Sequence, residues 1–182
     1  MTEYKLSQAQ QDMRTGYFWG APGVAVSGLV WLVAGFVALL HSPSRAVLVL
    51  LVGGALIHPA GVVLNKLLGR SGAHTAGNPL GVLAMEGTVW LIAGIAIAYA
   101  MQILRPEWFF PAMLLVIGGR YLTFQTVYGL RIYWLLGATL CAAGLALMLT
   151  PTPAATSALA GAAIELGFAV VIFILAKRRQ EN

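Results

Sequence analysis

Six apolar segments, each of roughly 20 residues, constrain the fold of this chain more than any other feature. A stretch of this length can cross a bilayer as a helix. Within the hydrocarbon every backbone N–H and C=O needs a partner inside the protein, and a helix supplies one from its own residues. We therefore expect an all-α integral membrane protein with a single domain over residues 1–182, of which residues 20–182 form a six-helix bundle. The expected transmembrane helices are Pro22–Leu40, Arg45–Leu68, Pro79–Met101, Glu107–Tyr128, Ile132–Leu149 and Ser157–Ala176.

The composition agrees with a membrane protein and excludes several function classes. Only 9% of the residues are charged and 59% are hydrophobic, whereas soluble domains carry about 25% charged residues. The net charge of +5 does not indicate nucleic-acid binding, because the basic residues stand at the ends of apolar segments. No nucleotide, metal or nucleophile motif is present. We expect the lipid bilayer as a partner, no nucleic acid, no cofactor, no metal and no enzymatic activity; a homo-oligomer stays open.

The distribution of lysine and arginine predicts the orientation. Positive residues gather in cytoplasmic loops of membrane proteins. One side of the expected bundle carries more of them than the other, which has Arg45 and Arg105. Both termini are therefore expected in the cytoplasm. The residues on the richer side are Lys5, Arg14, Lys66, Arg70, Arg131, Lys177, Arg178 and Arg179.

The N-terminal residues 1–19 form an amphipathic segment. Leu6, Ala9, Met13 and Tyr17 recur at the spacing of one helical face. Such a helix is expected to lie on the membrane surface. The alternative is a contact helix that closes one end of the bundle.

An internal repeat predicts how the helices pair. Ser27–Gly35 reads SGLVWLVAG and Glu86–Gly94 reads EGTVWLIAG, while Leu50–Gly54 (LLVGG) matches Leu115–Gly119 (LVIGG). Each matching pair of segments makes one helical hairpin, so the repeated hairpins run in the same sense. With a third, degraded copy, the chain is expected to form three tandem α-hairpins as parallel repeats. Glycines in these segments allow close helix packing.

Four ionisable residues fall well inside the apolar segments: Glu86, Arg120, Glu165 and His58. A charge at this depth costs about 3 kcal/mol or more and needs a partner in the bundle interior. At a rise of about 1.5 Å per residue, the four lie within about one turn of the same depth. We therefore expect one polar cluster, in which Arg120 pairs with Glu86 or Glu165. Gln125 is near enough in depth to line the same cavity.

This cluster has two interpretations. It is either a structural ion pair that holds the helices in register, or a site for a proton, an ion or a small anion. Two acids share one arginine, and Glu165 has no cation within its own hairpin. Glu165 is therefore the expected protonatable acid, with His58 as a second titrating group. We favour permeation of a proton, ion or small solute; the alternative is a non-catalytic membrane-structural, stress or partner-binding protein.

Several longer strings carry a family resemblance. AQQDMRTGYFWGAPGVAVSGLVWLVAG, IHPAGVVLNKLLGR, GNPLGVLAMEGTVWL and RPEWFFPAMLLVIGGRYLTFQTVYGLRIYW together cover most of residues 9–134. They resemble a family of small, uncharacterised bacterial polytopic membrane proteins, a domain of unknown function. The resemblance implies the bacterial inner membrane and no assigned site residues. The glycine and proline pattern of the hairpins is more weakly similar to the HdeD-like acid-stress membrane proteins.

Overall fold

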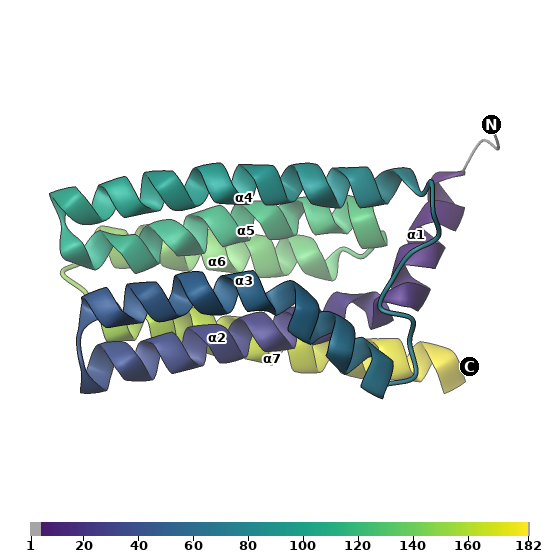
Figure 1. Cartoon of the computed structure of the whole chain (residues 1–182), viewed down its shortest axis with the longest axis horizontal. Coiled ribbons are helices and arrows are strands. Elements are labelled where there is room, and N and C mark those ends of the chain that lie inside the picture. Colours follow the sequence, from purple (N-terminus) through teal and green to yellow (C-terminus); the bar gives the residue numbers. More distant parts are fainter. Residues whose placement is uncertain (1–4, 182) are drawn as a thin grey trace.

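A computed structural model describes residues 5–181, which form a bundle of long helices with one short helix across its end (Figure 1). The expected N-terminal segment is thus described from Lys5 onwards, and residues 1–4 lie outside the described residues. No strand occurs in the part of the chain described. The α-helices are α1 (Leu6–Gly16), α2 (Ala21–Leu40), α3 (Pro43–Leu67), α4 (Pro79–Leu104), α5 (Phe109–Tyr128), α6 (Ile132–Met148) and α7 (Ala154–Glu181), with 3₁₀ turns at Phe18–Gly20 and Pro106–Trp108.

Local signals in the sequence explain where the long helices begin and end. Ser42 Oγ accepts a hydrogen bond from Arg45 N (3.3 Å) at the start of α3, and Asn78 Oδ1 accepts one from Leu80 N (3.0 Å) at the start of α4. Both caps precede a proline at the first helical position, where its missing N–H costs nothing. The helix α5 ends at Gly129, whose φ of 67° is a conformation that favours glycine.

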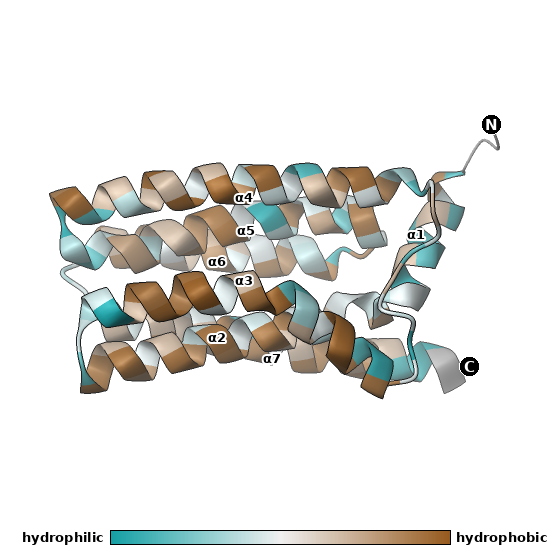
Figure 2. Ribbon diagram, viewed as in Figure 1, coloured by the Kyte–Doolittle hydropathy of each residue, from teal (hydrophilic) through white to brown (hydrophobic). Residues whose placement is uncertain are grey.

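Four helices are long and apolar enough to cross a membrane: Phe18–Leu40, Pro43–Leu67, Pro79–Leu104 and Ala154–Arg179. The helix α6 is apolar but shorter, with 17 residues. The helix α5 has 20 residues, and Figure 2 shows a hydrophilic stretch near its middle. Large apolar side chains are exposed along the outside of the bundle, as lipid contact requires. The chain therefore has the composition and architecture of a membrane protein.

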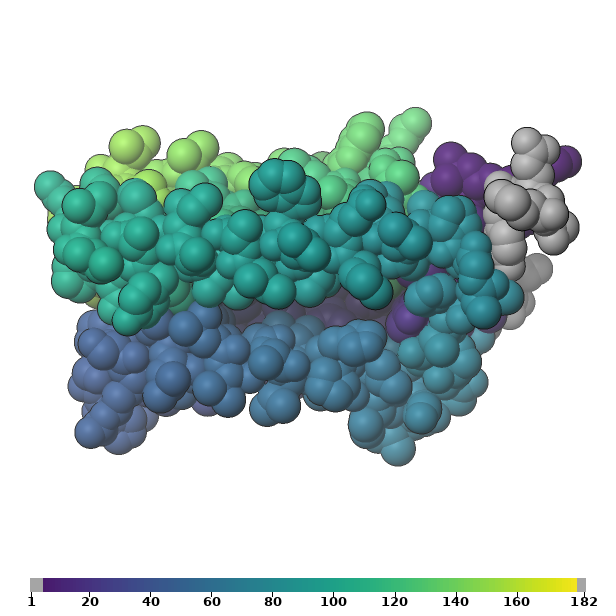
Figure 3. All heavy atoms as spheres, turned by 45° about the horizontal axis from the view of Figure 1, so that its top comes forward, coloured from purple at the N-terminus to yellow at the C-terminus, as the bar shows by residue number. Residues whose placement is uncertain are grey.

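The helices pack in two groups of three. The helix α2 packs closely on both α3 and α7, and α5 packs closely on both α4 and α6. The two groups meet where α7 touches α5 and α6. Between α3 and α4 the two groups stay apart, and Figure 3 shows a groove there.

The pairing of helices differs from three equivalent hairpins. The first two expected hairpins, α2 with α3 and α4 with α5, are packed pairs, but α6 and α7 touch only lightly. The last helix packs on α2 instead, because Gly28 and Gly35 leave room for Leu166 and Leu159 of α7. A β-carbon on either glycine would lie within 3 Å of these leucine side chains. Small residues thus determine which helices can pack closely on one another.

The short helix α1 lies across the end of the bundle (Figure 1), with Ala9, Met13 and Gly16 buried. Gln10 Nε2 donates to Thr126 O (2.9 Å) and Arg14 Nη1 donates to Tyr128 O (2.7 Å), so both satisfy the last carbonyls of α5. This arrangement corresponds to the contact-helix alternative rather than to a helix that lies only on the lipid surface.

The loop between α3 and α4 also holds α1. Asp12 accepts hydrogen bonds from Thr75 N (2.9 Å), Thr75 Oγ1 (2.8 Å) and Asn78 Nδ2 (2.7 Å). Asn78 Nδ2 donates to Ala9 O as well (3.0 Å), so one buried side chain joins α1 to the start of α4. Tyr17 Oη and His74 Nδ1 lie 2.9 Å apart at the other end of α1.

Candidate functional site

The structure does not bring the five predicted site residues into one cluster. Glu165 is fully buried, with 0% of its surface exposed. Arg120 and Gln125 are half-buried on α5. Glu86 on α4 and His58 on α3 are exposed on the outside of the chain. The expected polar centre is therefore divided into a buried acid, a half-buried arginine and two exposed groups.

Arg120 does not form the ion pair expected from the sequence. Its Nη2 donates to Thr88 Oγ1 of α4 (3.2 Å), and its guanidinium lies 5.5 Å from the centre of the Phe124 ring. The expected pairing with Glu86 fails for a geometric reason. Residues two apart on a helix point about 200° apart, so when Thr88 faces α5, Glu86 points away from it. Arg120 therefore links α4 to α5 through a neutral side chain.

Glu165 lies on the buried face of α7, roughly 16 Å along the axis from the first residue of that helix. The hydroxyl groups of Ser27 on α2 and Tyr121 on α5 are its polar neighbours. Neither carboxyl oxygen makes a hydrogen bond of regular geometry, and Glu165 is the only acid among the buried polar residues described. A buried carboxylate without a cation beside it is energetically unfavourable. The neutral acid is therefore the more stable form of Glu165 in this position.

Unpartnered polar atoms continue from Glu165 towards the start of α7. Ser157 Oγ and Trp31 Nε1 are buried and have no hydrogen-bond partner. The Trp31 ring packs on the bare backbone of Gly161, which lies one turn from Glu165 and one turn from Ser157. Buried polar groups normally find a partner in the protein or in ordered water. The interface of α2 and α7 thus holds a row of buried polar atoms without a protein partner.

Aromatic hydroxyls occupy the other half of the bundle interior. Tyr121 stacks on Tyr133 of α6 with ring centres 6.1 Å apart, and Tyr133 stacks on Tyr128 at 5.2 Å. Tyr133 Oη donates to Trp19 O (2.6 Å), next to the end that α1 covers. Tyrosine side chains therefore lead from the neighbourhood of Glu165 to the α1 end.

Most of the groups around Glu165 are not among the residues that the sequence predicts for the polar cluster. Ser27 aligns with Glu86 in the repeat, and Ser157 and Trp31 belong to apolar segments. A signal was present in the spacing, since Ser157, Gly161 and Glu165 recur every four residues and share one face of α7. In the described chain no three His, Cys, Asp or Glu side chains are close enough together to hold a metal ion.

A family model covers nearly the whole chain. Residues 6–175 match the model of a family of unknown function (DUF7010). The chain belongs to this family. The match includes every helix from α1 to most of α7, and with them all the residues of the buried polar row. No curated protein and no solved structure matches the chain, so the weaker likeness to the HdeD-like proteins stays a prediction.

Proposed function

We propose that this protein lets a proton, alone or together with a small solute or ion, cross the membrane, and that Glu165 is the group that carries the proton. The observation behind this proposal is a fully buried carboxyl group that has the Ser27 and Tyr121 hydroxyl groups beside it and no cation among the described residues. A structural ion pair would have brought Arg120 to that carboxyl group, whereas Arg120 binds Thr88. Ionisable groups inside membrane proteins commonly serve proton relays.

The surroundings of Glu165 support this role on both sides. Towards the start of α7, Trp31 Nε1 and Ser157 Oγ offer unpartnered polar atoms that bridging water can satisfy. Towards the α1 end, the hydroxyl groups of Tyr121 and Tyr133 can donate and accept hydrogen bonds, as a proton relay requires. A proton on Glu165 would exchange with water through the first row and with the α1 end through the second.

The proposal includes six membrane crossings with both termini on the cytoplasmic side of a bacterial inner membrane. The helices α5 and α6 extend about 30 Å and 25 Å at the helical rise, close to the thickness of the hydrocarbon core. They run beside the four longer apolar helices (Figure 1), and both ends of the chain lie at the same end of the bundle. Most of the arginines and lysines gather at that end, which favours a cytoplasmic location.

The second candidate is a non-catalytic structural or partner-binding role. Arg120 favours it, because a hydrogen bond to Thr88 and the Phe124 ring give that guanidinium a purely structural environment. The two candidates differ in what Glu165 does, since a structural role has no need of an unpaired acid.

Proton flux into liposomes tests the proposal. The purified protein is reconstituted with a pH-sensitive dye inside, and a pH gradient is applied. We expect flux above that of empty liposomes for the wild type and a loss of flux for Glu165→Gln, which keeps the shape but cannot release a proton. Glu86→Gln is the matched control, because it removes an exposed carboxyl group on α4; it should conduct like the wild type. Equal flux for Glu165→Gln and wild type, or no flux from wild type with any solute in a broad panel, would contradict the proposal.

A further inference from the structure

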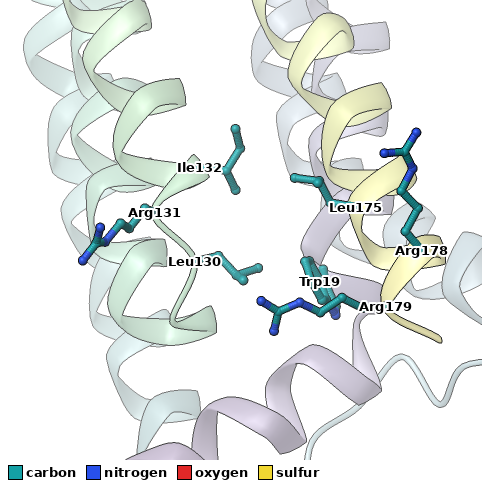
Figure 4. Close-up of a pocket in the computed structure, with 7 residues that line it drawn as sticks. All are labelled: Trp19, Leu130, Arg131, Ile132, Leu175, Arg178 and Arg179. Carbon is teal, nitrogen blue, oxygen red and sulfur yellow. The ribbon is translucent and has the colours of Figure 1, made fainter. Parts of the chain in front are cut away.

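A cavity of about 270 Å³ opens at the end of the bundle, between the start of α6 and the last turns of α7. Figure 4 shows its residues: α7 contributes one wall, the loop before α6 and the start of α6 the other, and Trp19 the floor. Arginines and apolar side chains line it together. The lining residues are Trp19, Leu130, Arg131, Ile132, Leu175, Arg178 and Arg179.

Charged and apolar side chains line different parts of the cavity. The Arg179 side chain reaches into the gap between the two walls (Figure 4), and its guanidinium lies 5.6 Å from the centre of the Trp19 ring. Ile132 and Leu175 extend towards each other from the two walls. Arg131 and Arg178 point away on the outer sides, so they add positive charge around the opening.

The chain adopts unusual backbone conformations to place Trp19. Phe18 and Trp19 have φ values of 46° and 60°, which side-chain-bearing residues rarely adopt, and Gly20 follows at 82°. The hydrogen bond from Tyr133 Oη to Trp19 O holds this turn (2.6 Å). Conformations of this kind persist only where the surrounding structure enforces them, and they are frequent at ligand sites.

Two positive charges lie close together at this end of the bundle. Arg14 lies close enough to Arg179 that the second positive charge contributes, after the larger effect of burial, to lowering the pKa of Arg14. Basic pockets between transmembrane helices bind anionic lipid headgroups. The light contact between α6 and α7 leaves the apolar part of the cavity open between two helices that face lipid.

We propose that this cavity binds the phosphate of an anionic phospholipid, with Arg179 over Trp19 as the phosphate-binding group and an acyl chain against Ile132 and Leu175. The occupant is a lipid rather than free phosphate, because free phosphate has no apolar part that could contact the apolar walls. Neither the proton-carrying role of Glu165 nor its test depends on this site.

Lipid binding is measured by native mass spectrometry and by melting in mixed micelles, with phosphatidylglycerol compared with phosphatidylcholine. We expect phosphatidylglycerol, but not phosphatidylcholine, to stay bound and to raise the melting temperature of the wild type. Arg179→Gln should weaken phosphatidylglycerol binding about fivefold, the factor that one basic residue at an anionic surface supplies. Arg105→Gln is the matched control, because Arg105 stacks on Trp108 at the opposite end in the same way (5.1 Å); it should bind like the wild type.

Two further measurements separate a bound lipid from free phosphate and control for misfolding of the variants. Inorganic phosphate alone should leave the melting temperature unchanged; an equal rise with phosphate overturns the lipid assignment. Arg179→Lys keeps the charge without the forked guanidinium and should bind with intermediate affinity, at unchanged helix content. Binding of phosphatidylglycerol that is equal in wild type and a folded Arg179→Gln also overturns the proposal, as does equal binding of both lipids.

Discussion

Arg120 and Tyr121 are neighbours on α5, yet they serve different helices. Successive helical residues point about 100° apart, so Arg120 reaches Thr88 on α4 while Tyr121 faces Glu165 on α7. The sequence predicts that Arg120 and Glu165 lie at similar depth. It does not show the rotation of each helix about its axis, and this rotation separates the two charges.

The bond between Arg120 and Thr88 predicts a measurable coupling. Thr88→Val removes the acceptor but keeps the shape, so it should lower the free energy of unfolding by about 1 kcal/mol, within the range of polar contacts between membrane helices. Arg120→Met should remove that penalty, because no unpaired guanidinium remains. A double-mutant cycle on the melting temperature in detergent measures the coupling. Additive effects of the two substitutions would show that the hydrogen bond contributes nothing.

Close contacts between helices depend on individual glycines. In the pair formed by α5 and α6, a β-carbon on Gly118 would lie 2.8 Å from Gly137 O and 3.0 Å from Cys141 N, so the backbones themselves would have to separate. The neighbouring Gly119 has open space where its β-carbon would be. Two adjacent glycines in the same motif thus have different roles.

Alanine substitutions separate these roles. Gly118→Ala should destabilise the protein by about 1–3 kcal/mol, the usual cost of overpacking. Gly119→Ala should be neutral or slightly stabilising, because alanine favours the helix over glycine. Melting temperatures in one detergent measure both effects. Equal losses for the two variants would contradict the contact between α5 and α6.

The attachment of α1 should depend on pH through Asp12. Burial alone would raise the pKa of Asp12, but hydrogen bonds from Asn78 and Thr75 together outweigh it, and the pKa lies below its usual 3.8. A lowered pKa means that the stabilisation is present above about pH 4 and is lost as the pH falls through the folded-state pKa. The protection factors of the α1 amides, which are corrected for the intrinsic exchange rate at each pH, should therefore fall in acid while those of the long helices stay unchanged.

Asp12→Ala tests the same contact at neutral pH. It should expose α1 to exchange with a loss of about 1 kcal/mol, a typical net value for such bonds. Glu107 makes no equivalent bond in the described part of the chain, so Glu107→Ala serves as the control. Unchanged α1 protection in Asp12→Ala would mean that the buried face alone holds this helix.

The sequence predicts the helices better than their partners. The expected starts of α4 and α6, at Pro79 and Ile132, agree with the structure because Asn78-Pro79 and the Gly129 turn are local signals. The two helices of the expected third hairpin touch only lightly, since the contact of Gly28 and Gly35 with α7 joins that helix to α2. Contacts so distant in sequence leave no periodic trace in a single chain.

The proposed orientation predicts which loops of the bundle can be labelled from outside the cell. Both termini and the loop after α3 lie at one end, whereas the connections after α2, α4 and α6 lie at the other (Figure 1). Single cysteines at Ser42 and Thr152, in a Cys141→Ala background, should react with an impermeant thiol reagent from outside the cell. A cysteine at Ser71 should react only after the cells are opened. Labelling of Ser71→Cys in intact cells would reverse the proposed orientation.

The account of this bundle as a proton carrier rests on one neutral acid that exchanges with water. Infrared difference spectra of the membrane-reconstituted protein measure this property. We expect the carbonyl stretch of a protonated carboxyl group at neutral pH, a shift of that band when D₂O replaces H₂O, and no such band in Glu165→Gln. Glu86→Gln should retain it. A spectrum in which wild type and Glu165→Gln are identical, or a Glu165 band that does not respond to D₂O, would contradict the account.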